Sequence, residues 1–214
     1  MSSQVRGGTR WKRFALVMVP SVVATAAVGV GLAQGALAAS FAVSGQSFKV
    51  STDKLVGENF VQYGSVAVGT DIEGKEKQAH PVAVSGFSKA TITNMCQSVV
   101  TPNLPFGLGS VSLELNAGTN PAKPVEATNL YLDVAQLDAD AYFEQIDIGV
   151  GASSLGAPGI QPGTEGAVKA GGFAQRAKKA TLTNVEQTAW ATTAGTFKLS
   201  NLSLKLHKGV KECF

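Results

Sequence analysis

The sequence predicts an all-β protein: an internally duplicated array of strands, arranged as a β-sandwich or as a solenoid-like stack. Three observations predict this class. Apolar residues alternate with polar ones in short bursts, a ten-residue phrase occurs twice, and 24 Gly and 8 Pro among 214 residues supply many turns. An N-terminal segment stands apart from this pattern.

Residues 1–38 have the composition of a secretory signal. Basic side chains precede an uncharged stretch, and Ala36-Leu37-Ala38 is a small-x-small processing pattern. We expect cleavage after Ala38 or Ala39 and export by the general secretion route, since no Arg-Arg pair is present. The remaining residues, 39–214, form one β-rich domain at the cell envelope or outside the cell.

The alternative for the same segment is an uncleaved membrane anchor. The stretch from Phe14 to Ala33 is long enough to cross a bilayer, although it is mostly Ala, Val and Gly and is interrupted by Pro20. This alternative also places the β-rich domain outside the cytoplasm.

The net charge of +3 comes from the N-terminal segment. Four of the 18 basic side chains lie within residues 1–38, which leaves 14 against 15 acidic ones in the rest of the chain. Since no basic excess remains to contact phosphates, the sequence predicts no nucleic-acid partner.

The strands are predicted from apolar alternation with period two, which is typical of strands with one buried face. Residues 137–144 alternate in the same way, and we assign them to a strand rather than to a helical turn. Residues 186–195 leave a short helix open as an alternative. The bursts are Phe48-x-Val50, Val66-x-Val68, Val82-x-Val84, Val111-x-Leu113-x-Leu115, Leu130-x-Leu132-x-Val134, Ile146-x-Ile148-x-Val150 and Leu202-x-Leu204-x-Leu206.

The repeated phrase predicts an internal duplication. "KATITNMCQS" at 89–98 returns as "KATLTNVEQT" at 179–188 with six of ten letters identical. The flanking sequences resemble each other loosely, so the copies are placed at 48–100 and 130–190, each burying its strands against the other. The second copy contains a long glycine loop, residues 149–172 with eight Gly, which is expected to be mobile.

The two cysteines, Cys96 and Cys213, are predicted to form a disulfide, because an even count in an exported chain favours pairing. This explains the discordant position of the phrase: Cys96 fastens the C-terminus, and Glu186 has no such task. The alternative is a buried free thiol and an unrelated one near the chain end.

No catalytic motif is present. The closest approach to a nucleophile elbow, Gly86-Phe87-Ser88-Lys89-Ala90, lacks the final Gly and leads into a strand where the elbow requires a helix. Ser88 is the least unsuitable nucleophile, and His80 or His207 would have to serve as its base; both histidines are expected at the surface.

The sequence predicts neither a metal nor a cofactor. Histidine and cysteine spacings do not match zinc sites, and Asp138-x-Asp140 lacks the Gly and Glu of a calcium loop. No phosphate-binding glycine loop ends in Lys-Ser or Lys-Thr.

Four segments carry a resemblance that covers essentially the whole chain: the Arg- and Lys-led signal, "SGFSKATITNMCQSV", "KKATLTNVEQTAW" and "SNLSLKLHKGVKECF". They resemble an uncharacterised family of exported proteins from streptomycetes and related actinobacteria, catalogued as a domain of unknown function. The resemblance implies a small multi-pass membrane protein as a partner. Members often carry the automatic label "cholesterol esterase", which the residues of this chain do not support.

Two function classes follow. The first is a non-catalytic exported protein that binds a lipid-like or other apolar ligand, or that assembles with itself through strand edges. The alternative is a lipid or sterol ester hydrolase of atypical design that uses Ser88 with His80 or His207.

Overall fold

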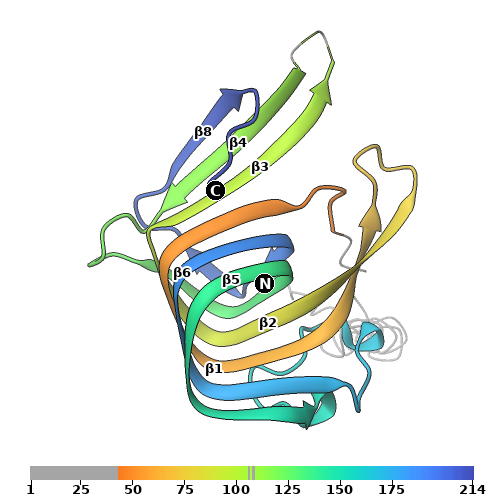
Figure 1. Ribbon diagram of the computed structural model, residues 1–214, viewed down its shortest axis with the longest axis vertical. Helices are drawn as coiled ribbons and strands as arrows, with labels where there is room; N and C mark the ends of the chain where they lie inside the picture. The colour runs from red at the N-terminus through yellow and green to blue at the C-terminus, as the bar shows by residue number, and fades with distance from the viewer. Residues whose placement is uncertain (1–42, 106, 108) are drawn as a thin grey trace, which may run out of the picture. The chain divides into compact units, whose positions relative to one another are not determined.

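The computed structural model describes residues 43–105, 107 and 109–214, which form strands and two short 3-10 turns (Figure 1). The predicted all-β class is confirmed. The predicted signal or anchor of residues 1–38 lies outside the described residues. The elements in chain order are β1 (Phe48–Thr70), β2 (Lys77–Thr93), β3 (Met95–Leu104), β4 (Gly109–Ala117), β5 (Val125–Gly151), η1 (Ala152–Ser154), η2 (Glu165–Ala167), β6 (Phe173–Thr193), β7 (Thr196–Lys198) and β8 (Ser203–Lys208).

Four long strands close into an antiparallel barrel. The order β2-β5-β6-β1 is closed by a further pairing of β1 with β2, and every pairing between the named strands is antiparallel. This arrangement replaces the predicted sandwich or solenoid, since the strands that the structure describes form one sheet, part of which closes into the barrel. Closure leaves these four strands without a free edge along the paired segments.

The length of β5 makes the closure geometrically feasible. Its residues 125–134 pair with β2, and its residues 131–151 pair with β6, so one bent strand of 27 residues joins both sides of the barrel (Figure 1). The sequence bursts that were predicted as separate strands are parts of this single element. The predicted strand at 137–144 is confirmed, and residues 186–193 continue β6 rather than forming a helix.

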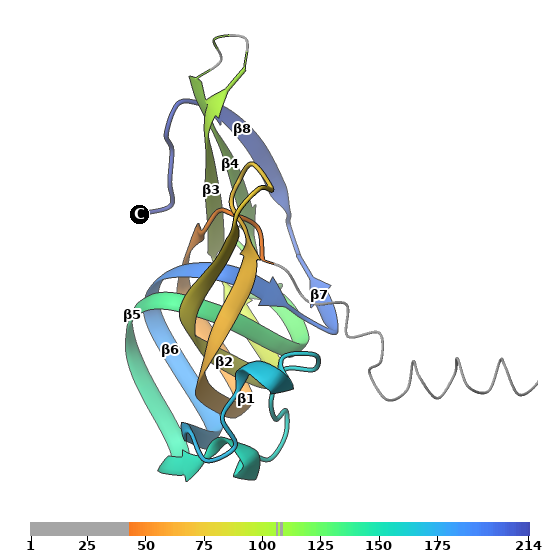
Figure 2. The same cartoon turned by 90° about the vertical axis from the view of Figure 1, so that its right-hand side faces the viewer.

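A three-stranded extension continues the sheet beyond the barrel (Figure 2). The first strand of the extension, β3, pairs with the beginning of β1, and β4 and β8 follow it. The predicted disulfide is confirmed: it joins Cys96 in β3 to Cys213, 117 residues later. The chain end is held further by the Cys213 backbone N–H, which donates to Ser98 Oγ at 3.0 Å.

The two copies of the repeated phrase lie on either side of β1 in the same register. Gly57 pairs with Ala90 on one side and with Ala180 on the other. Ser51 likewise pairs with both residues of the discordant position, Cys96 and Glu186. The duplication itself stays a prediction, because matching positions do not establish a common origin.

The asparagine of each copy has a conformation that few residue types tolerate. Asn94 and Asn184 have φ of 53° and 52°, a region that Asn enters more readily than most side chains. Each Nδ2 donates to a carboxylate on the neighbouring strand, Asn94 to Asp53 at 3.1 Å and Asn184 to Asp140 at 2.8 Å. Each asparagine therefore contributes in two ways: its backbone adopts a positive φ, and its side chain bonds to an aspartate of the neighbouring strand.

The strands bury two hydrophobic cores on their opposite faces. Phe60 and Leu130 belong to the first core, whereas their neighbours Val61 and Tyr131 belong to the second. This alternation follows from the period of a strand. A small cavity of about 150 Å³ lies in the first core and is large enough for a few water molecules.

Gly57 is required by the packing of the first core. A Cβ at this position would overlap the ring of Phe87, which is 2% exposed and packs 5.4 Å from the ring of Phe60. We therefore expect Gly57→Ala to lower the free energy of unfolding by about 1–3 kcal/mol, as overpacking does. Urea unfolding measures this loss. Gly64→Ala, in the same strand and with open space around its position, is the matched control and should show no comparable loss.

The glycine-rich loop between β5 and β6 is packed against the second core, although the sequence favours mobility. Leu155 and Ala152 are 5% and 2% exposed, and two tyrosines of the barrel bond to the loop backbone. Its few apolar side chains suffice because they join apolar residues of the strands in one buried cluster. Within the part of the chain that the structure describes, no helix has the length and hydropathy of a membrane span.

Candidate functional site

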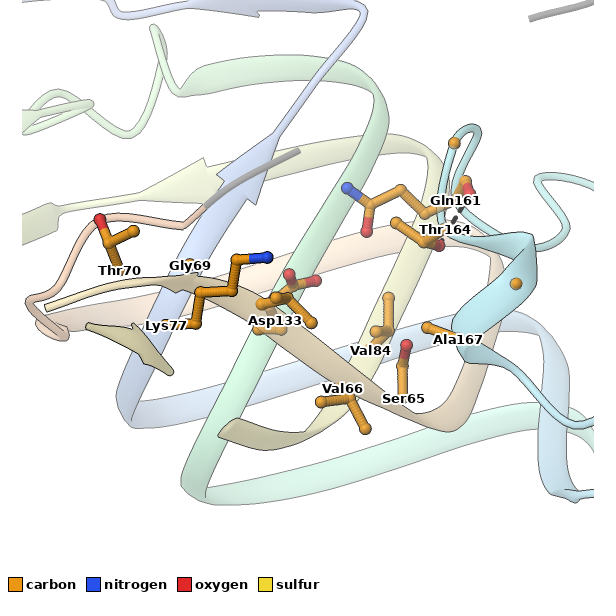
Figure 3. Close-up of a pocket in the computed structure, with 14 residues that line it drawn as sticks. Ser65, Val66, Gly69, Thr70, Lys77, Val84, Asp133, Gln161, Thr164 and Ala167 are labelled. Atoms are coloured by element: carbon orange, nitrogen blue, oxygen red, sulfur yellow. Dashed lines mark hydrogen bonds between the residues drawn. The ribbon is translucent and has the colours of Figure 1, made fainter. Parts of the chain in front are cut away.

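A cavity of about 400 Å³ opens between the second core and the glycine-rich loop (Figure 3). Its walls come from residues 65–70 of β1, from Lys77 and Val84 of β2, from Asp133 of β5, and from residues between 161 and 167 of the loop. We call it the Asp133 cavity. Four segments distant in sequence therefore meet at one site.

Asp133 is a buried carboxyl group without a partner. Leu132 and Val134 face the first core, so the alternation of β5 directs Asp133 to the other face, between Val84 and Ala191 of the neighbouring strands. It is 5% exposed, and no hydrogen bond or ion pair to it occurs among the described residues. Burial raises the pKa of the Asp133 carboxyl to about 6.

Gln161 places a second acceptor at the same site. Its side chain is 2% exposed and extends from the loop into the cavity (Figure 3). Its Nε2 donates to Thr193 Oγ1 at 3.2 Å, whereas its Oε1 has no hydrogen-bond partner among the described residues. A buried acceptor without a partner is unusual in a folded protein, because it costs free energy unless a ligand or water satisfies it.

Two tyrosines hold the loop over the barrel. Tyr63 Oη accepts the backbone N–H of Gln161 at 2.7 Å, and Tyr131 Oη donates to the carbonyl of Pro158 at 3.0 Å. Burial is the main cause that raises the pKa of Tyr63 to about 12, and burial also raises the pKa of Tyr131. Both phenols therefore stay neutral near pH 7 and contribute no charge to the site.

The remaining walls combine valines and alanines with the hydroxyl side chains of Ser65, Thr70 and Thr164 and one basic side chain. Val84 is 1% exposed, while Val66 and Val68 are 42% and 50% exposed along β1. Lys77 is exposed, and Figure 3 shows its side chain extending toward the side of Asp133. The described ion pairs include none between Lys77 and Asp133, so the carboxylate is not neutralised by this lysine.

This arrangement is suited to binding a small molecule. Apolar walls with a few convergent polar groups are the usual composition of ligand pockets. Both unpartnered groups are acceptors, so a complementary ligand must donate hydrogen bonds. Within the described residues, no group of three or more His, Cys, Asp or Glu could hold a metal ion.

The structure does not bring Ser88, His80 and His207 together. Ser88 Oγ accepts a hydrogen bond from Asn59 at 3.2 Å, His80 stacks on Trp190 with ring centroids 3.5 Å apart, and His207 Nε2 lies 2.8 Å from Glu114.

Ser88 and His80 belong to one strand and are separated by about 26 Å of extended chain. His207 belongs to the extension. None of the three lines the Asp133 cavity, and ester hydrolysis stays an untested alternative.

Sequence reasoning missed both Asp133 and Gln161. Asp133 interrupts a run of alternating apolar residues, which predicts a solvent-exposed position as long as only one face of the strand is buried. The unbroken apolar run Leu130-Tyr131-Leu132 is the signal that both faces of β5 are covered there. Gln161 stands in a loop whose packing the sequence does not reveal.

Comparison with known proteins adds the family. Residues 44–214 match the model of a family of unknown function, DUF6230. No curated protein and no solved structure matches the chain. The predicted resemblance to an uncharacterised family is confirmed at that level.

Proposed function

The chain belongs to this family of unknown function, DUF6230, and we propose that it acts by binding a small amphiphilic molecule in the Asp133 cavity, without catalysing a reaction. The observation that carries the proposal is that two buried acceptors line one cavity. They are the Asp133 carboxyl, which has no hydrogen bond or ion pair among the described residues, and the unsatisfied Gln161 Oε1. A buried ionisable group in a cavity is a candidate binding group, because its burial lowers stability unless a ligand compensates for it.

The size and lining of the cavity support the same function. A volume of about 400 Å³ lies within the range of small-molecule sites, roughly 300–1,000 Å³. The valines of β1 and β2 would contact an apolar portion of the ligand, and the two acceptors would contact its polar end. A lipid-like molecule with a hydrogen-bond donor in its head group meets both requirements.

The proposed setting is the cell envelope or the extracellular space. The Cys96–Cys213 disulfide supports an oxidising compartment, because such bonds persist mainly there. Export by the general secretion route and a small multi-pass membrane protein as a partner belong to this proposal, the latter from the family resemblance alone.

Self-assembly through β8 is a second candidate. Leu204 and Leu206 are 55% and 70% exposed on this last strand of the sheet order, and edge strands of this kind pair with other chains. Sedimentation across a hundredfold range of protein concentration tests it: a concentration-dependent dimer that Leu206→Lys abolishes would support assembly, and a constant monomer would contradict it.

Ligand binding is tested on the exported protein by native mass spectrometry. We expect a mass surplus of one small molecule that organic extraction removes. Ala167→Trp should abolish the surplus, because Ala167 lines the cavity and the indole would fill its mouth.

Ala170→Trp is the matched control: it is equally exposed, lies in the same loop and does not line the cavity. Equal surpluses in both variants would contradict the proposed site.

A further inference from the structure

Building on the proposed function, we propose that the ligand carries an alkylammonium group, and that this cation binds between the Asp133 carboxylate and Gln161 Oε1. The inference narrows the ligand from any hydrogen-bond donor to an organic cation with an apolar portion.

The first argument is the match between donors and acceptors. Gln161 Oε1 is a buried atom without a partner among the described residues, and the Asp133 carboxyl, 5% exposed, has no hydrogen bond or ion pair among them. The amide oxygen and the ionised carboxyl are acceptors only. An ammonium group has three donors and no acceptor, so it can satisfy all three oxygens without leaving a group of its own unpaired. A hydroxyl group has one donor and would leave acceptors unsatisfied.

The second argument is charge. Across the neighbouring strands, Asp133 is in register with Val84, Tyr63 and Ala191, and none of these residues carries a positive charge. A cation beside this carboxylate would form a charge-assisted hydrogen bond, which is roughly twice as strong as a neutral one. An anionic ligand would instead face a like charge in an apolar surrounding.

The charged and titratable groups that face the cavity are few. Tyr63 and Tyr131 stay neutral near pH 7, and Lys77 is exposed at the beginning of β2. Lys77 lines the cavity and extends toward Asp133 (Figure 3), but it is exposed, so water screens its charge. The cation at Asp133 is therefore opposed by no buried positive group among the described residues.

A metal ion fits the site poorly. Calcium and magnesium take six or more oxygen ligands, usually with several carboxylates, whereas the lining residues supply one carboxylate, the Gln161 amide oxygen and the hydroxyls of Ser65, Thr70 and Thr164. The valines and Ala167 would instead contact an alkyl chain. The chemistry of the walls and of the acceptors thus points to one class, a primary amine with an aliphatic tail.

Isothermal titration with three eight-carbon probes tests the inference on the exported protein at pH 7.5. The probes are n-octylammonium, octan-1-ol and octanoate, which share one tail and differ in head group. We expect n-octylammonium to bind at least tenfold more tightly than octan-1-ol, and octanoate to show no binding. Asp133→Asn should lower the affinity for n-octylammonium at least tenfold and remove its advantage over octan-1-ol.

Asp138→Asn is the matched control, because Asp138 lies on the same strand and is exposed outside the cavity. It should leave all three affinities unchanged. Equal binding of n-octylammonium and octan-1-ol, both abolished by Ala167→Trp, would overturn the cation inference and leave the proposed function standing. Absence of binding by all three probes would overturn both.

Discussion

Asp133→Asn is expected to stabilise the protein by about 3 kcal/mol at pH 7, since the pKa of this carboxyl rises from 3.8 to about 6 on folding and each unit corresponds to about 1.4 kcal/mol. The folded state holds the Asp133 proton more tightly than the unfolded state does. The favourable contribution of the protonated carboxyl is therefore complete below pH 4 and is lost as the pH rises through 6. The Asn variant carries no charge and escapes this loss.

Urea unfolding of both proteins between pH 4 and pH 7 measures the effect. The two free energies of unfolding should coincide near pH 4, separate between pH 4 and 6, and differ by a constant amount above. Asp138→Asn, exposed on the same strand, should show no such separation. If Asp133→Asn were no more stable than wild type at pH 7, the carboxylate would have a favourable partner and the argument for an unsatisfied site would fail.

Removing the disulfide with Cys96→Ser and Cys213→Ser together is expected to lower the free energy of unfolding by about 4–5 kcal/mol on the chain-entropy model. The bond joins residues 117 apart, so its loss frees a long loop in the unfolded chain. In the folded state, hydrogen bonds from the Cys213 and Lys211 backbone to Ser98 and Ser112 still hold the chain end.

The comparison is a urea unfolding curve of the double variant against the wild type under non-reducing conditions. Wild type with excess reductant is the control, and its midpoint should move to that of the double variant. Unchanged midpoints in both cases would show that the link does not restrict the unfolded chain as the model requires.

The strand class could be predicted from the sequence because period-two alternation is a local property. The great length of β1 and β5 could not be predicted. Asn59 in β1 and Gln145 in β5 have φ of 51° and 54° and interrupt the alternation in mid-strand. Such irregularities resemble turns in a sequence, yet here they bend long strands without ending them. The disulfide was predictable because two cysteines allow only one intramolecular pairing.

The candidate site could not be predicted from the sequence, for a different reason. Asp133 has the position of a surface residue on its own strand, and its burial depends on a loop that follows some twenty residues later. Ser88 and the two histidines were chosen by residue type, and the fold does not bring them together. Ser88 and His80 lie eight residues apart along β2, and His207 lies on β8 of the extension. Residue type pointed to three side chains that lie apart in the fold, whereas tertiary packing buried the carboxyl of Asp133.

The barrel closes between segments that are made at different times. Tyr63 of β1 pairs with Ala174 of β6, so β1 completes its pairing only when the later strand is available. Until then the β1–β2 hairpin has an unpaired flank, open to association with other unfolded chains. A chaperone that shields this hairpin would therefore be expected to raise the yield of native protein more than one that acts on the completed chain.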